Sequence, residues 1–404
     1  MSSAKLPRPL FNQPFLFYNL VFFFVFSHIA FFYLYPLFLE MEGASKTKIG
    51  IVMGLFPVGT VLSRPLMGWL VARIGEKKVF LGGLAVISLS GALYLVVKKI
   101  GFSLFSLRFL HGVGFSAFIA SSFTGITWRI PPERRGEAFG FVGAVILLAI
   151  ATMPLAGEHL IKWMGYPLLF QVESVFAFCA LFMTWIFFPE EIRPEENSRT
   201  RSFVEILSKK AFIGVLVVTV LFVQGQATVL NFIALVAEHL GVSSGKFLGV
   251  AATIAIFCRL FVAKSFDRYS KKKFLVISFL IFAFGLSLIP QIGSIRLFYL
   301  CAIFYGVGMG LLYPLLNVLA ADQAADEEMP AAMGVFTGVF DAGFITGSML
   351  SGWFADLFSL SWIFYFGSVV AILGGVVTLF LPLNNQAFPP YNVVYSREKG
   401  NQRF

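Results

Sequence analysis

The 404-residue chain is 58% hydrophobic and only 13% charged, with a formal net charge of +10. A soluble domain is about half apolar and a quarter charged, so this composition excludes an ordinary soluble protein and predicts a surface that faces lipid. It also excludes a nucleic-acid partner, because the bases recur in short loops at alternate ends of apolar runs and do not gather on one soluble face.

Apolar runs long enough to span a bilayer, about 20 residues each, recur along nearly the whole chain. The first run follows Lys5 and Arg8 as a signal peptide would, but it is too long and lacks a small-residue cleavage site, so we interpret it as a retained span. The sequence therefore predicts an all-α polytopic membrane protein with twelve transmembrane helices. In chain order the predicted spans are 14–39, 49–72, 78–98, 102–128, 136–158, 168–188, 211–238, 246–266, 273–290, 297–320, 332–355 and 361–382.

The distribution of Lys and Arg predicts the orientation. Most bases lie in the loops that share a side with both termini, so we expect that side to be cytoplasmic in a multi-pass protein of the cell (inner) membrane. The acidic loop 321–331 falls on the same side, but acidic residues contribute little to orientation. The loops of the opposite side carry only Lys46, Lys48, Lys98, Lys99, Lys162, Lys246 and Arg296.

An internal repeat predicts two six-helix bundles related by pseudo-two-fold symmetry. At an offset of about 195 residues Arg64 aligns with Arg259 and Arg73 with Arg268, and the register continues through later helices. Duplicated bundles of this kind are typical of transporters, whose sites lie at the repeat interface. The predicted domains are an N-terminal bundle (10–188), a cytoplasmic linker (189–210), a C-terminal bundle (211–383) and a cytoplasmic tail (384–404).

The loop that follows the second predicted span resembles a known signature. Residues 68–78 read Gly-Trp-Leu-Val-Ala-Arg-Ile-Gly-Glu-Lys-Lys, which is similar to the Gly-x-x-x-Asp-Arg-x-Gly-Arg-Lys signature of the major facilitator superfamily. Ala72 stands where the signature has its acid, whereas the second copy keeps the acid as Asp267. The resemblance covers about residues 10–383 and implies that Arg73, Asp267 and Arg268 contribute to a cytoplasmic gate.

Three further patterns in the membrane spans resemble the same superfamily. Residues 108–114 match Arg-x-x-x-Gly-x-Gly, and residues 153–157 are a decayed form of the antiporter pattern Gly-Pro-x-x-Gly. Residues 305–308 with 313–317 resemble the sugar or drug efflux-like branch. The resemblance therefore implies a transporter that works by alternating access, and the branch implies efflux.

An ionisable group within a membrane span is costly and indicates function, and the clearest cases in the predicted spans are Arg64, Arg108, Arg259 and Asp341. Arg64, Arg259 and Asp341 have similar depths from the cytoplasmic side. We expect Asp341 to pair with Arg64 or Arg259 and to couple protonation to movement of the halves; a static packing contact is the alternative. Arg108 is interpreted either as a contact to substrate or to a proton carrier, or as a structural bond to a carbonyl or to Glu173.

Polar stripes on several spans predict a substrate-binding cavity. Arg108 and His111 share one helical face with Phe115, Phe118 and Ser122, at spacings that place them on one side of a helix. Hydrogen bonding between helices is the alternative for each stripe. The candidate substrate-binding residues are His28, Tyr35, Arg108, His111, Gln224, Asn231, Tyr305, Tyr313 and Asn317.

Small residues at two positions predict close helix packing. Gly140-x-x-x-Ala144 and Gly334-x-x-x-Gly338 are pairs that allow backbones to approach. Residues 241–246 do not match a phosphate-binding loop, because the spacing is wrong and no Ser or Thr follows the Lys. No cofactor, metal site or catalytic constellation is predicted, so we do not expect an enzyme.

The function predicted from the sequence is secondary active transport of a small organic solute, most simply as proton-coupled efflux. Asp341 is the first candidate proton carrier, followed by His111 and Glu173. An uptake facilitator or symporter of a sugar or metabolite is the near alternative, and a non-transporting scaffold or sensor is the alternative from another class. The expected partners are the substrate, protons and the lipid bilayer, with the protein acting as a monomer.

Overall fold

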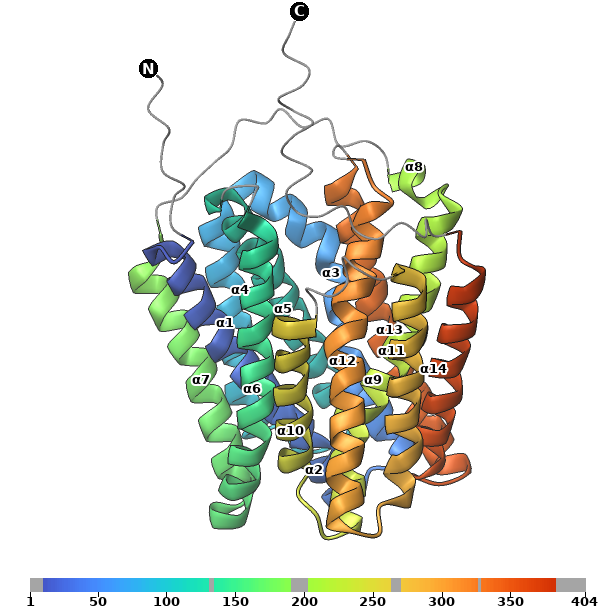
Figure 1. Ribbon diagram of the computed structural model, residues 1–404. Coiled ribbons are helices and arrows are strands. Elements are labelled where there is room, and N and C mark those ends of the chain that lie inside the picture. Colours follow the sequence, from blue (N-terminus) through green and yellow to red (C-terminus); the bar gives the residue numbers. More distant parts are fainter. Residues whose placement is uncertain (1–9, 131–133, 190–202, 263–269, 326–327, 383–404) are drawn as a thin grey trace, which may run out of the picture. The chain divides into compact units, whose positions relative to one another are not determined.

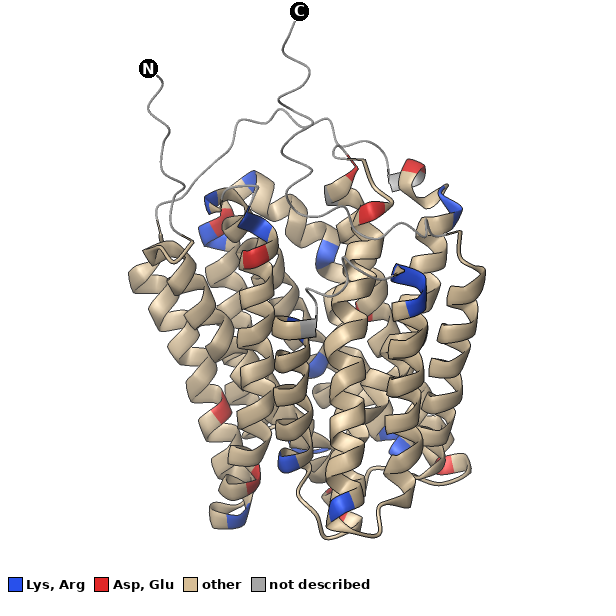
Figure 2. Ribbon diagram, in the orientation of Figure 1, with Lys and Arg blue, Asp and Glu red and all other residues tan. Residues whose placement is uncertain are grey.

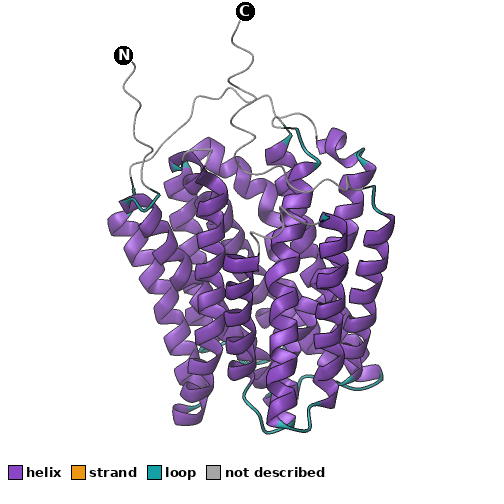
Figure 3. Cartoon of the chain, in the orientation of Figure 1, coloured by secondary structure: helices purple, strands orange, loops and turns teal. Residues whose placement is uncertain are grey.

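The computed structural model describes residues 10–130, 134–189, 203–262, 270–325 and 328–382. All regular secondary structure in these ranges is helical, and they contain no strand (Figure 3). In a bilayer the backbone finds no water to bond with, so a helix that satisfies its own N–H and C=O groups is the spanning structure that these apolar runs allow.

Figure 1 shows the helices in chain order. The first span is broken by a 3₁₀ turn and the eighth ends in a π-helical turn. The elements are α1 Gln13–Phe31, η1 Phe32–Leu34, α2 Tyr35–Met41, α3 Lys46–Ile74, α4 Glu76–Tyr94, α5 Phe102–Arg129, α6 Arg135–Met164, α7 Tyr166–Phe187, α8 Phe203–Leu207, α9 Lys210–His239, α10 Ser244–Phe257, η3 Cys258–Val262, α11 Lys271–Leu288, η5 Ile289–Gln291, α12 Ile295–Asp322, α13 Met329–Leu357 and α14 Trp362–Phe380.

The predicted spans are confirmed. Within the described ranges, 12 helices are long and apolar enough to cross a membrane. The largest differences are at α4, which ends at Tyr94 where the prediction continued to residue 98, and at α6, which continues to Met164. The end of the predicted eighth span, 263–266, lies outside the described residues.

Glycines allow two of the tightest connections. Gly75 (φ 92°) separates α3 from α4, and Gly165 (φ 77°) separates α6 from α7. A positive φ is easily reached only by glycine, so each pair of spanning helices can reverse direction at a single residue. Prolines lie inside α3, α6 and α12, and membrane helices tolerate proline where neighbouring helices or Ser and Thr side chains satisfy the freed backbone groups.

Contacts divide the chain into two compact units. Unit 1 comprises 1–197, 228–249 and 344–360, and unit 2 comprises 198–227, 250–343 and 361–404. The boundaries fall inside α9, α10 and α13, so the units differ from the two halves that the repeat predicts. The predicted linker contains the short helix α8, and the predicted tail lies outside the described residues.

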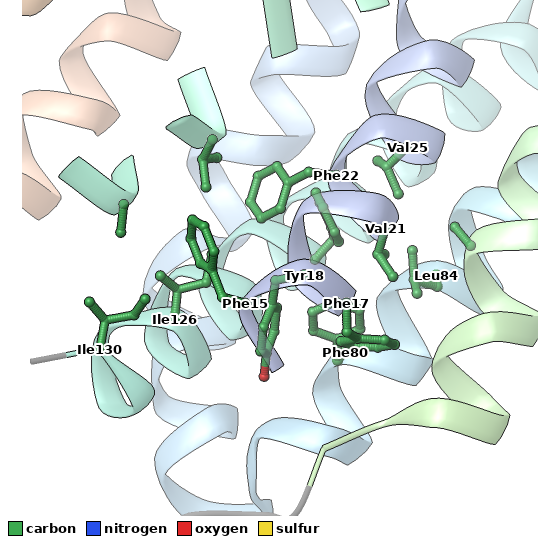
Figure 4. Packing of buried hydrophobic residues seen from close by; sticks show 14 of the residues in the cluster. Phe15, Phe17, Tyr18, Val21, Phe22, Val25, Phe80, Leu84, Ile126 and Ile130 are labelled. Carbon is green, nitrogen blue, oxygen red and sulfur yellow. The ribbon is translucent and has the colours of Figure 1, made fainter. Parts of the chain in front are cut away.

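In unit 1, α5 packs on both α3 and α4, and α1 packs on α6 and α7 (Figure 1). The centre of this bundle is a cluster of aromatic and aliphatic side chains from α1, α4 and α5 that includes Tyr18, Phe22, Phe80 and Ile126 (Figure 4). In unit 2, α11 packs against α12 and α14.

Charged side chains gather near the helix ends, and the middle of most helices carries none (Figure 2). Large apolar side chains such as Trp185 (67% exposed) and Phe182 (58% exposed) point outward instead. A water-facing surface would reverse this distribution, so these outward faces are suited to acyl chains.

Candidate functional site

The most concentrated group of ionisable side chains inside the membrane spans lies in unit 1 and consists of His28, His111 and Glu173. They come from α1, α5 and α7, and all three are buried, with 0%, 0% and 1% exposure. His28 Nδ1 forms an ion pair with Glu173 Oε2, and His28 Nε2 lies 3.0 Å from His111 Nε2. The imidazole of His28 therefore connects a carboxylate to a second imidazole.

Helix α4 closes this cluster on another side. The Tyr94 hydroxyl lies 3.4 Å from His111 Nδ1. A Cβ at Gly91 would lie 3.2 Å from His28 Cε1 and 3.3 Å from Glu173 Oε2, so glycine is what allows α4 to approach the pair. The space beside Glu173 is lined mainly by aromatic side chains and is too small to hold a water molecule.

Arg108 lies next to this cluster and is held by carbonyl and aromatic groups. Its Nε donates to Val52 O at 3.3 Å, and its guanidinium carbon lies 5.0 Å from the Phe32 ring centre and 5.2 Å from that of Phe56. The residue is 3% exposed. The sequence predicted a structural bond from Arg108 either to a carbonyl or to Glu173, and the structure shows the bond to a carbonyl.

The structure thus brings together four of the predicted substrate-binding residues: His28, Tyr35, Arg108 and His111. The Tyr35 ring packs against Phe32, Tyr94 and Phe170, and the residue is 1% exposed. These residues were expected to line a substrate-binding cavity, but all four are buried among other side chains in this structure. Their arrangement is suited to holding and transferring a proton, which requires buried titratable groups in contact.

The other predicted substrate-binding residues lie on α9 and α12. Asn231 Nδ2 donates to Ser348 Oγ at 2.7 Å within unit 1. In unit 2, Gln224 is buried, the buried Tyr305 ring packs on Phe282, and Tyr313 and Asn317 are half-buried. Asn231 thus makes the contact between helices that was the alternative to substrate binding.

The predicted gating residues are divided between the units. Arg64 is half-buried on α3 in unit 1, whereas Arg259 and the half-buried Asp341 belong to unit 2. Arg259 faces the ring of Tyr313 at 5.7 Å, and among the described residues it has no ion-pair partner. Arg73 is exposed and stacks on Trp69 at 5.0 Å. Asp267 and Arg268 lie outside the described residues.

A second buried charge cluster was not expected from the sequence. Glu76, at the start of α4, is 0% exposed; Arg129 Nη1 donates to its Oε2 at 2.8 Å, and the Tyr18 hydroxyl donates to its Oε1. A Cβ at Gly125 would lie 2.6 Å from the carboxyl carbon of Glu76, so the glycine leaves room for this carboxylate. Glu76 occupies the position at which the resembled signature has an Arg. This replacement of a base by an acid is the feature of the sequence from which the cluster could have been predicted.

The predicted small-residue surfaces have a different structural role from the one expected. Nothing lies within 4 Å of a Cβ placed at Gly140, Gly334 or Gly338. The close approach of helices in unit 1 occurs instead at Gly59 and Gly112, between α3 and α5, where a Cβ would lie 3.1–3.2 Å from backbone atoms of the facing helix. Within the described ranges no group of His, Cys, Asp or Glu side chains has the arrangement of a metal site.

Solved structures with the same arrangement of helices are transporters. A variant of the nucleoside transporter NupG matches with a TM-score of 0.77 over 92% of this chain and 100% of that chain, at 11% identity. The human organic anion transporter MFSD10 matches with a TM-score of 0.71 over 92% of this chain, at 15% identity. At these identities the likeness concerns the fold alone.

Curated relatives are similar over most of the chain. The staphylopine export protein of Staphylococcus aureus is 26% identical over 357 residues, which cover 82% of this chain and 86% of the relative. The multi-drug resistance efflux pump PmrA of Streptococcus pneumoniae is 22% identical over the same shares of the two chains. The family model of the Major Facilitator Superfamily matches residues 15–271 and 254–392. The chain is therefore a member of the Major Facilitator Superfamily and a membrane transporter.

Proposed function

We propose that this transporter exports a small organic solute in exchange for protons, by alternating access and as a monomer. Efflux is supported by the curated relatives, which are named as exporters. The observation that carries the proton coupling is the buried contact of Glu173 with His28, which in turn contacts His111.

The cluster is suited to coupling because its contacts depend on where one proton resides. A carboxylate in a dry interior needs a proton or a cationic partner. When Glu173 is ionised, a protonated His28 is its partner; when Glu173 takes the proton, the attraction is lost. Because Glu173, His28 and His111 belong to three helices, this change alters the packing of α1 against α7 and α5.

The orientation is part of the same proposal. The basic loops favour a location in the cell (inner) membrane with both termini on the cytoplasmic side. A proton that enters from the outside then drives the solute outward. The predicted contact of Asp341 with Arg64 remains a proposal for the gate on the cytoplasmic side, distinct from the proton carrier.

Proteoliposomes with an imposed pH gradient test the coupling. The solutes offered are one organic anion, one sugar, one nucleoside and one cationic dye. We expect the wild type to accumulate at least one of them only with the gradient, and Glu173→Gln to lose gradient-driven transport while it still exchanges labelled for unlabelled solute.

Glu137→Gln is the matched control, because the Glu137 side chain is 53% exposed and pairs with Arg134, three residues earlier in the chain. It should behave as the wild type. Equal transport with and without the gradient in the wild type would identify an uptake facilitator, and no transport of any solute would favour the scaffold or sensor.

A further inference from the structure

The π-helical turn of unit 2 places an arginine in an unusual setting. Residues Cys258–Val262 continue α10 as a π-helix that packs on α12. The two helices are close here, since a Cβ at Gly310 would lie 2.7 Å from the Cα of Ala255. Single π-turns inside α-helices are frequent at functional sites, because they re-aim the side chains they carry.

Arg259, on this turn, has a guanidinium nitrogen that is not hydrogen-bonded within the described part of the chain. Its Nε is buried without a hydrogen-bond partner, and among the described side chains no carboxylate lies within ion-pair distance. Its recorded neighbour is Tyr313, whose ring is 5.7 Å from the guanidinium carbon and 5.0 Å from the ring of Phe340. Arg259 is half-buried as a whole, and a cation whose donors are withdrawn from water is stabilised by an anionic partner, so this setting favours the binding of an anion.

We propose that Arg259 binds a carboxylate of the transported solute and that Tyr313 and Phe340 contact its apolar part. Guanidinium is suited to this role because its planar donors match the two oxygens of a carboxylate. This inference rests on the proposed transport function, for which it names the substrate class: amphipathic organic anions.

Thermal unfolding of the purified protein tests the site without vesicles or a gradient. The probes are 3-phenylpropionate, benzoate and adipate, each compared with its neutral amide. A ligand that binds the folded state raises the midpoint of unfolding, so we expect at least one acid to raise it by a few degrees and the amides to leave it unchanged.

Arg259→Gln should remove the response to the acid, and Arg259→Lys should keep part of it. Arg296→Gln, at an exposed arginine near the start of α12, is the control. An equal response to acid and amide, no response to any acid, or an unaltered response in Arg259→Gln would overturn the proposal. Because binding is measured directly, these outcomes do not depend on whether transport is coupled to protons.

A second, independent observation concerns a motif that occurs twice. Gly43-Ala-Ser45-Lys-Thr-Lys48 and Gly241-Val-Ser243-Ser-Gly-Lys246 are separated by 198 residues. Both glycines have positive φ (81° and 65°), and each serine hydroxyl accepts a hydrogen bond from the backbone N–H of the lysine three residues later, at 3.3 and 3.0 Å. The two motifs are therefore the same structure, at the N-termini of α3 and α10.

A carboxylate from another helix caps each of these N-termini, and the same separation of 198 residues relates the two acids. Asp356 of α13 accepts from the backbone N–H groups of Lys46 and Thr47 at 2.9 and 2.8 Å. Glu158 of α6 accepts from the N–H of Gly245 at 2.8 Å and from Ser244 Oγ at 2.7 Å. All four segments lie in unit 1.

Glycines bring these segments into backbone contact. A Cβ at Gly50 would lie 3.1 Å from the Cα of Gly352, and a Cβ at Gly245 would lie 2.8 Å from the carbonyl carbon of Pro154. Each acid therefore joins a helix of one sequence half to a helix of the other. Negative charge at a helix N-terminus is favourable, since it meets the free N–H groups and the positive end of the helix dipole.

We infer that Glu158 and Asp356 are positioning residues for transport, which hold this end of the protein closed until the solute leaves. In the predicted orientation this end faces the outside. Opening separates both caps together, because the two contacts are copies related by the repeat. The strength of the two caps thus determines the population of the outward-open state.

Distances between nitroxide labels test this inference in the full chain, with Cys179, Cys258 and Cys301 replaced by Ser. Labels go on the exposed pairs Glu42 with Phe358 and Lys162 with Leu240. Loss of a cap weakens a helix terminus by about 1 kcal/mol, so Glu158→Ala or Asp356→Ala should raise the population with long distances about fivefold. The double variant should raise it further.

Glu137→Ala, on the same helix as Glu158, is the matched control and should leave the distances unchanged. Gly352→Val supplies a test that keeps both acids, because its side chain forces α13 away from α3 and should open the same label pair. Unchanged distances in the double alanine variant, with the protein still folded and monodisperse, would refute the gating role.

Discussion

Glu76 and Arg129 form an ion pair that is almost completely buried, at 2.8 Å, and the Tyr18 hydroxyl donates to the same carboxylate. The pair joins the start of α4 to the end of α5, and Tyr18 joins both to α1. Ala72 cannot supply the acid of the resembled signature, and Glu76 supplies a carboxylate four residues later, directed into unit 1. An ion pair and a hydrogen bond to the carboxylate of Glu76 thus connect α1, α4 and α5.

Removing one partner of this pair should destabilise the protein strongly. Glu76→Gln or Arg129→Gln removes the ion-pair partner of a charge that stays buried, which is unfavourable by about 3–5 kcal/mol. We expect the midpoint of thermal unfolding to fall by several degrees in each single variant. Glu76→Gln combined with Arg129→Gln should recover much of the loss, because no buried charge then remains.

Arg134→Gln is the matched control for this prediction. Arg134 pairs with Glu137 at 2.9 Å on an exposed surface, where ion pairs contribute about 0–1 kcal/mol. Its unfolding midpoint should stay near that of the wild type. A double variant that is as unstable as the sum of the two single variants would show that Glu76 and Arg129 act independently.

Arg108 should tolerate replacement by lysine poorly. The planar guanidinium contacts the rings of Phe32, Phe56 and Tyr35 and donates through Nε to Val52 O, and an ammonium group cannot reproduce that stacking. Arg108→Lys should lower the free energy of unfolding by about 1–2 kcal/mol. The check is denaturant unfolding; stability equal to the wild type would mean that the ring contacts contribute nothing.

The spans and part of the site could be predicted because they depend on local pattern. The apolar runs have the length of a bilayer-spanning helix, and Arg108 with His111 follows helical spacing within one run. The contact of His28 with Glu173 could not be predicted in this way, because these residues are 145 positions apart. Only the packing of α1 against α7 brings them together.

The caps could have been found from the sequence, since the Gly-x-Ser-x-x-Lys motif occurs twice at a fixed separation. The second copy resembles a phosphate-binding loop without matching its spacing. The hydrogen bond from Gly245 N–H to Glu158 shows that the motif binds a carboxylate of the same chain instead. The burial of Glu76 could not be predicted from the sequence, for a different reason. A glutamate next to Lys77 and Lys78 has the appearance of a solvated loop residue, and its direction depends on Gly125 in another helix.

Replacement of Gly112 by alanine should destabilise the protein, whereas replacement of Gly140 by alanine should not. A Cβ at Gly112 would lie 3.1 Å from the backbone N of Thr60, so Gly112→Ala must push α5 away from α3. We expect a loss of about 1–3 kcal/mol, as for other overpacked sites. Gly140→Ala meets open space in the second turn of α6 and should instead stabilise by about 0.5–1 kcal/mol. Thermal unfolding of both variants measures the difference, and equal losses would contradict the packing described here.

Asp341 and Glu173 should have separable effects on transport, because they are proposed to do different things. Asp341 is half-buried and is proposed to belong to the cytoplasmic gate. Glu173 is fully buried beside His28 and is proposed to carry the proton. Asp341→Asn should therefore slow gradient-driven transport and solute exchange by a similar factor, leaving their ratio unchanged. Glu173→Gln should abolish the first and keep the second. Both rates are measured in the same proteoliposomes with Glu137→Gln as control. If Asp341→Asn removes the response to the gradient and Glu173→Gln retains it, the proton carrier is Asp341, and the buried cluster of unit 1 serves packing alone.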